Sequence, residues 1–129
     1  RAHLVRALLE GVAFGLRDGL ALMRDLGVSP EVLRAVGGGT RSRLWREIMA
    51  ASLEVRLQRL AAEEGPAMGA ALLALVGVGV HADVEVAVAA AVHPQGEDEA
   101  PDPDLARRYA SLHERFRRLY PALKQAKLF

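Results

Sequence analysis

The sequence predicts a helix-rich α/β fold, and two patterns carry this prediction. Long stretches have apolar residues spaced three and four apart, which is the repeat of an amphipathic α-helix. Two shorter runs, 32–36 and 55–60, have the character of buried or half-buried strands. The predicted order along the chain is helix, strand, glycine turn, helix, strand and then three more helices.

The first helix is expected to run from the start of the chain to the neighbourhood of Gly27, a residue that suits the position just beyond a helix end. One face of this helix carries an apolar stripe: Leu4, Val5, Leu8, Val12, Leu16, Leu20 and Met23. A second row consists of glycines four residues apart: Gly11, Gly15 and Gly19. Because each glycine weakens a helix by about 1 kcal/mol relative to alanine, we expect another element to pack closely in the groove that they make.

Three consecutive glycines, Gly37, Gly38 and Gly39, follow the first predicted strand. Glycine fits where a backbone turns sharply or where another group approaches it closely. A helix that begins just beyond would point free N–H groups toward the turn, which favours an anion such as phosphate. The run matches neither the Gly-x-Gly-x-x-Gly dinucleotide fingerprint nor the Gly-x-x-x-x-Gly-Lys-Ser/Thr phosphate loop. On these residues alone, a tight strand-to-helix connection and a nucleotide contact are both open.

The residues after the glycines suit either use. Thr40 and Ser42 offer hydroxyl groups for capping the next helix or for binding a ligand. Arg41 and Arg43 are two cations beside the turn, where they would serve a polyphosphate or form a solvated helix face. The opposite face carries the only tryptophan and is expected to pack in the core: Leu44, Trp45, Ile48, Met49 and Ser52.

The third helix is expected to begin at Gly65-Pro66, after Glu63 and Glu64, whose charges complement its positive end. It is apolar nearly all round as far as Leu75, so we expect it to be buried and tightly packed.

The rest of the chain is predicted to be helical apart from one connection. Residues 83–92 combine alternating valines with alanines, and we favour a helix there. Residues 94–104 are acidic and contain prolines, which indicates a surface linker. The last helix is amphipathic from Leu105 to Tyr120, and Pro121 is expected to limit its continuation.

Composition limits the functions that the chain can have. Its 129 residues are 51% hydrophobic and 26% charged, which indicates one globular segment over 1–129. A net charge of +1 gives no electrostatic reason to expect a nucleic acid or a membrane as partner, and the longest apolar run, 66–80, is too short to span a membrane. The absence of cysteine excludes disulfides and thiolate zinc sites and is compatible with the cytoplasm. The four histidines lack metal-ligand spacing and no nucleophile–base set can be assembled, so we assign no metal-binding or catalytic residue.

Two strands cannot make a stable sheet on their own. The chain also begins directly in helical periodicity at Arg1, without an initiator methionine. We therefore expect it to be a piece of a longer protein that supplies the rest of the sheet.

Residues 37–46, Gly-Gly-Gly-Thr-Arg-Ser-Arg-Leu-Trp-Arg, resemble the adenosine-binding motif of the FGGY carbohydrate kinases. The resemblance continues through 49–51 and through 63–71, Glu-Glu-Gly-Pro-Ala-Met-Gly-Ala-Ala. Residues 10–19 look like the long helix that precedes this motif, and 109–123 look like the terminal helix of the xylulose kinases within the family. Together these segments cover most of the chain in the family's order.

The resemblance implies two actin-like (ribonuclease H-like) domains, with ATP bound against the C-terminal domain and the sugar against the N-terminal domain. With Mg²⁺, held mainly by the nucleotide and the missing part, the γ-phosphoryl group of ATP passes to a sugar hydroxyl. This chain then corresponds to the C-terminal half of the C-terminal domain, and the expected substrate is D-xylulose, giving D-xylulose 5-phosphate. The family's catalytic aspartate lies in the absent portion, so this chain alone is expected to be inactive.

What the resemblance carries over to this chain is nucleotide binding, at six residues: Gly37, Gly38, Gly39, Thr40, Ser42 and Arg43. Gly38 and Gly39 match glycines whose backbone lies against the nucleotide, so that a side chain at either position would intrude on it. Thr40 stands where alanine is common. Arg43 stands where glycerol kinases use an asparagine to contact adenine, and an arginine would instead stack or contact a phosphate. The implied partners are ATP and ADP and a pentulose bound through the missing domain. The resemblance leaves the oligomeric state open; an exposed sheet edge and apolar helix faces would allow a homodimer.

Three other hypotheses are open. The chain could come from another FGGY kinase, acting on glycerol, gluconate or ribulose, or from another actin-like protein such as a chaperone ATPase. It could also be a non-enzymatic helical interaction module, whose small-residue faces at Gly11, Gly15, Gly19 and 67–74 pack on a partner.

Overall fold

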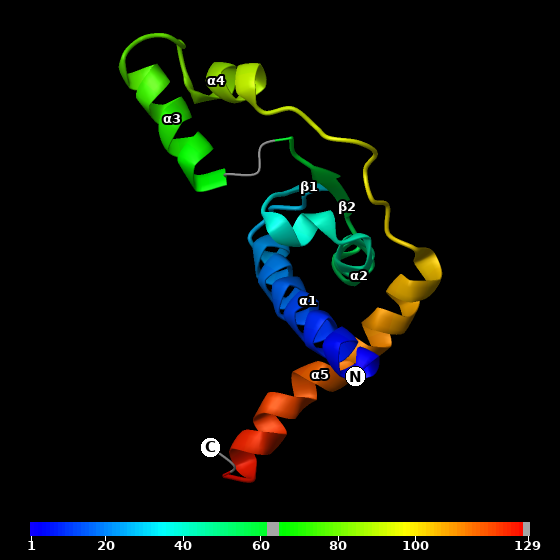
Figure 1. Cartoon of the computed structure of the whole chain (residues 1–129). Helices are drawn as coiled ribbons and strands as arrows, with labels where there is room; N and C mark the ends of the chain where they lie inside the picture. The colour runs from blue at the N-terminus through cyan, green and yellow to red at the C-terminus, as the bar shows by residue number, and fades with distance from the viewer. Residues whose placement is uncertain (62–64, 128–129) are drawn as a thin grey trace.

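The computed structural model describes residues 1–61 and 65–127 and has the predicted order of elements (Figure 1). The elements are α1 (Ala2–Asp25), β1 (Val32–Ala35), the 3₁₀ turn η1 (Gly38–Arg41), α2 (Arg43–Leu53), β2 (Arg56–Arg59), α3 (Gly65–Gly77), α4 (Val84–Ala91) and α5 (Pro103–Gln125). The helix favoured at 83–92 is therefore confirmed as α4, with Asp83 capping its first turn.

The sheet consists of β1 and β2, which run parallel with α2 as the connection between them. The register pairs Val32 with Arg56 and Ala35 with Arg59. Segment 94–99, within the predicted surface linker, runs along β2 through isolated antiparallel bridges at Pro94 and Glu99. This segment covers backbone groups of β2 that a two-stranded sheet would leave unpaired.

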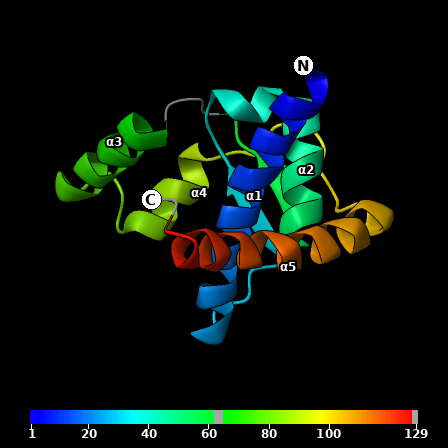
Figure 2. The ribbon, with the colours of Figure 1, turned by 90° about the horizontal axis from the view of Figure 1, so that it is seen from below.

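The core forms where α2 packs between the other elements. Every residue from Ile48 to Leu53 of α2 is buried. Towards the sheet lies one cluster: Leu20, Met49, Ala50, Leu53, Val55 and Leu57. Towards α5 lies the other: Ala13, Phe14, Ile48, Ala51 and Tyr109. Figure 2 shows α5 crossing α1 and α2, so the second cluster ties the C-terminal helix to the first half of the chain.

The end of α1 is built as the sequence predicts. Gly27 has a φ of 86°, in the left-handed region that glycine adopts without strain. Its N–H donates to the carbonyl of Arg24 at 2.9 Å, and the N–H of Val28 donates to that of Met23 at 3.0 Å. These two bonds define a Schellman motif, which ends the helix and turns the chain toward β1.

The apolar stripe predicted on α1 is largely outside the core of this chain. Leu4, Leu8 and Val12 are 58–70% exposed, and of the stripe only Leu20 is buried. The face that packs is the neighbouring one, with Ala13 and Phe14. The expectation that an element fills the glycine groove is also wrong among the described residues, because a Cβ atom built at any of the three glycines meets nothing within 4 Å.

Two predictions about the second half are likewise wrong. In α3 only Leu72 is buried and Leu73 is 61% exposed, because α3 packs mainly on α4 and the pair projects from the rest of the molecule (Figure 1). Glu63 and Glu64, predicted to precede this helix, lie outside the described residues. Pro121 does not end α5, which continues to Gln125. A proline removes one N–H bond and kinks a helix, and four further residues can still add helical bonds beyond it.

Candidate nucleotide-binding site

The glycine run forms a tight turn between β1 and α2. Gly37 enters it with a φ of 92°, a conformation that favours glycine. The N–H of Thr40 donates to the carbonyl of Gly37 at 3.0 Å, and the N–H of Ser42 donates to that of Gly39 at 3.1 Å. The Thr40 hydroxyl also donates to the Gly37 carbonyl, at 2.7 Å. The turn is therefore closed by its own bonds.

Gly38 and Gly39 differ in what lies beside them. A Cβ atom at Gly38 would meet nothing within 4 Å. A Cβ atom at Gly39 would lie 3.3 Å from both Cδ1 and Nε1 of Trp45. The close approach at Gly39 is thus made by this chain's own tryptophan, whereas the backbone at Gly38 is open to another molecule.

Ser42 and Arg43 are both engaged within α2. The Ser42 Oγ accepts a hydrogen bond from the N–H of Trp45 at 3.3 Å. Of the two uses predicted for this hydroxyl, capping the helix or binding a ligand, the structure shows capping. The Arg43 side chain is 81% exposed, and its Nε lies 2.7 Å from Oε1 of Glu47. This i, i+4 pair corresponds to the solvated helix face that the sequence left open.

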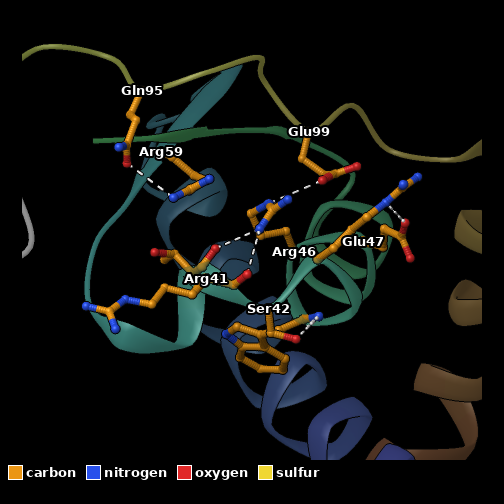
Figure 3. A network of polar contacts seen from close by, with 10 residues as sticks. Arg41, Ser42, Arg46, Glu47, Arg59, Gln95 and Glu99 are labelled. Carbon is orange, nitrogen blue, oxygen red and sulfur yellow. Dashed lines mark hydrogen bonds and ion pairs between the residues drawn. The ribbon is translucent and has the colours of Figure 1, made fainter. Parts of the chain in front are cut away.

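Arg46 supports the turn and was not among the predicted site residues (Figure 3). Its Nη1 donates to the carbonyl oxygens of Thr40 at 2.8 Å and Arg41 at 3.4 Å. Its Nε donates to Oε2 of Glu99 at 3.3 Å. The only sequence signal for this role was a basic residue in the helix after a glycine turn. The contact with Glu99 could not be predicted, because the two residues are 53 positions apart in the sequence.

A largely apolar groove of about 600 Å³ opens beside the turn. Gly39, Thr40 and Trp45 line it together with residues of α1, β1 and β2. Gly15 and Gly19 of α1 form part of its wall. Two glycines of the row on α1 and one glycine of the turn, predicted as separate features, therefore border one groove.

The described residues bring together no group of three or more histidine, aspartate or glutamate side chains that could hold a metal ion. Among the same residues, no helix combines the length and apolar character needed to cross a membrane.

Comparison with known proteins decides the family. Residues 1–78 match the C-terminal domain of the FGGY family of carbohydrate kinases. The chain belongs to this family. A xylulose kinase of Staphylococcus epidermidis is 35% identical over 119 residues, which cover 88% of this chain and 23% of that protein. A xylulose kinase of Klebsiella pneumoniae is 36% identical over 124 residues, covering 95% of this chain and 25% of that protein.

Solved structures agree with the predicted fold class. The crystal structure of xylulose kinase from Rhodospirillum rubrum matches with a TM-score of 0.79 and 42% identity, over 95% of this chain and 25% of that one. Gluconate kinase from Lactobacillus acidophilus matches with a TM-score of 0.82 at 22% identity, over 93% of this chain and 24% of that one, so the fold is common to kinases named for different sugars. The helix-rich α/β, actin-like class is confirmed, and the chain spans about a quarter of the length of the relatives that it matches.

Proposed function

We propose that this chain is the nucleotide-binding part of an ATP-dependent sugar kinase. ATP supplies the γ-phosphoryl group that is transferred to a sugar hydroxyl, with Mg²⁺ bound mainly to the nucleotide. The observation that carries the proposal is the open backbone at Gly38, beside an apolar groove, in a chain of the FGGY family. An apolar cleft edged by a few polar groups is the usual form of a small-molecule site.

The six proposed nucleotide-binding residues have different tasks. Gly37 and Gly38 give the nucleotide an exposed backbone to lie against, since neither has a neighbour near its Cβ position. Gly39 makes room for Trp45, and the Thr40 and Ser42 hydroxyls fix the turn and the start of α2. Arg43, held at the surface by Glu47, supplies a cation for a phosphate or a stacking surface for the base.

The proposed substrate is D-xylulose, and the product is D-xylulose 5-phosphate. Support comes from curated relatives named xylulose kinase, several of them more than 30% identical to this chain. The sugar and the catalytic groups would be held by parts that this chain does not contain, so the chain alone should have no kinase turnover. Activity from the pure 129-residue chain would contradict this assignment. The partners would be ATP, ADP, the pentulose and a second copy of the protein, in the cytoplasm.

Gly38 provides the cleanest test of nucleotide binding. Gly39→Val would also press on Trp45, and any side chain at Gly37 would strain the backbone because of its positive φ. Neither substitution would therefore separate an effect on nucleotide binding from an effect on the fold. In the whole protein carrying this segment, Gly38→Ala and then Gly38→Val should weaken ADP binding in that order, by roughly tenfold or more for valine. Isothermal titration calorimetry with ADP measures the change.

The matched control is Gly77→Ala, at another glycine with open space and no positive φ, at the end of α3. It should leave ADP affinity unchanged. If Gly38→Val also left it unchanged while the protein stayed folded, the nucleotide would not lie against this turn and the proposed site would be wrong.

A further inference from the structure

The carbonyl side of the glycine turn is held by α2. Arg46 has 15% of its side chain exposed, and its Nη1 reaches the carbonyl oxygens of Thr40 and Arg41. The last carbonyls of a short helical turn lack N–H partners within it, and a nearby cation interacts favourably with their dipoles. Arg46 therefore fixes the end of the turn that follows the open glycine.

Glu99 in turn fixes Arg46. The Arg46 Nε donates to the Glu99 carboxylate at 3.3 Å, and the Glu99 side chain is 23% exposed. The Glu99 backbone is itself bonded to β2: its N–H donates to the Leu57 carbonyl at 2.8 Å, and its carbonyl accepts from the Leu57 N–H at 3.0 Å. A continuous set of contacts thus runs from the sheet through Glu99 and Arg46 to the turn (Figure 3).

Further bonds secure the same segment along β2. The amide of Gln58 donates to Asp98 at 3.2 Å, and Arg59 donates to the side chain of Gln95 at 3.2 Å. This segment lies beyond residues 1–78, which match the family's C-terminal domain. These bonds, together with the Glu99 bridge to Leu57, hold segment 94–99 against β2.

We propose that Arg46 and Glu99 are positioning residues for the nucleotide, and that segment 94–99 is part of the support of the nucleotide site. The inference rests on the proposed function. Neither side chain needs to touch the nucleotide, because both act through the carbonyl oxygens of Thr40 and Arg41. Their loss should change the affinity for ATP and leave the sugar site unaffected.

The test uses the whole protein carrying this segment, with ATP and D-xylulose varied separately. Glu99→Gln and Arg46→Gln should each raise the KM for ATP by roughly tenfold, the size expected when a charge-assisted hydrogen bond is lost. The KM for the sugar, and kcat at saturating ATP, should stay within about twofold of the wild type. The double variant should lose less than the product of the two single effects, since the residues act as one pair.

Arg46→Lys distinguishes positioning from mere charge. A lysine ammonium cannot bond the turn carbonyls and Glu99 with the planar fork of a guanidinium, so rescue should be only partial. The control is Asp104→Asn, which removes an exposed carboxylate paired with Arg107 at the start of α5. This variant should change neither KM.

Three outcomes would overturn the proposal. The first is a lowered Tm in Glu99→Gln and Arg46→Gln with an unaltered KM for ATP, which would leave only a structural role and would leave the proposed function intact. The second is an equal rise in the KM for the sugar. The third is a wild-type protein that binds no ATP or ADP, which would remove the proposed function as well. If the Arg46 variants do not fold, the nearly isosteric Glu99→Gln decides between the two roles. Its second readout is the change in Trp45 fluorescence when ADP binds, and Trp45→Phe is the control for that signal.

Discussion

The hydroxyl group of Tyr109 tests the packing of α5 on α1. The Tyr109 side chain is 1% exposed, and its ring meets that of Phe14 edge-on at 5.6 Å. Its hydroxyl donates to Oε1 of Glu10 at 2.9 Å and accepts from Nη2 of Arg6 at 3.0 Å. Tyr109→Phe removes both hydrogen bonds and keeps the ring contact.

The magnitude follows from what remains in the variant. Glu10 keeps its ion pair with Arg6 at 2.8 Å, and 21% of its side chain is exposed, so water can replace the lost hydroxyl. Hydrogen bonds to charged groups contribute about 1.5–3 kcal/mol when buried, and this partial exposure reduces the expected loss of unfolding free energy to about 1–2 kcal/mol. Urea denaturation at pH 7, followed by circular dichroism, measures it.

The same substitution makes a prediction about pH. Burial, and then the hydrogen bond to Glu10, raise the pKa of the Tyr109 hydroxyl above its ordinary value. An unfolded tyrosine loses its proton near pH 10, so the folded state holds the proton more tightly above that pH. The stabilisation by Tyr109 is therefore complete below about pH 10 and is lost as the pH rises through the folded-state pKa.

The difference in stability between the wild type and Tyr109→Phe should consequently shrink between pH 10 and pH 11. Equal stabilities at pH 7 would refute the hydrogen-bond network, and a difference that stayed constant up to pH 11 would refute the raised pKa. Glu10→Gln, combined with Tyr109→Phe in a double-mutant cycle, separates the bond between these two side chains from the other effects.

Two further predictions concern α2. Ile48→Ala should lower the unfolding free energy by about 2–5 kcal/mol, because Ile48 is fully buried. Leu44→Ala, at a residue that is 43% exposed on the same helix, should lower it much less, and urea denaturation compares the two variants. Ser42→Ala should cost about 1 kcal/mol through loss of the cap on the Trp45 N–H, visible as a lowered Tm, and an unchanged Tm would show that this cap contributes nothing.

Local patterns were sufficient to predict the order of elements. A short apolar run ending at glycine located β1, and an alternating pattern located β2. Apolar residues three and four apart located the amphipathic helices, and the glycine at 27 fixed the end of α1. These signals are local, because they depend on the backbone preferences and spacing of neighbouring residues.

Periodicity could not identify which apolar face becomes the core. In α1 both Leu8 and Phe14 look suitable, and only the packing of α2 and α5 selects the face with Phe14. In α3 an all-round apolar surface predicts burial, but the described part of the chain provides only α4 as its main neighbour.

Only the part of the candidate site that is made by neighbouring residues could be predicted from the sequence. The turn at 37–42 is a local feature, and its residues are enough to show the resemblance to the FGGY motif. The role of Arg46 could not be predicted in this way, because it depends on Glu99, which is brought close to Arg46 by the pairing of its segment with β2.

The proposed function requires that a nucleotide lies against the glycine turn. A crystal structure of the whole protein with bound ADP tests it most directly. We predict ADP in van der Waals contact with the backbone of Gly38, with the hydrogen bonds from Arg46 to the carbonyls of Thr40 and Arg41 intact. ADP bound elsewhere, with Gly38 facing solvent or another part of the protein, would contradict the claim.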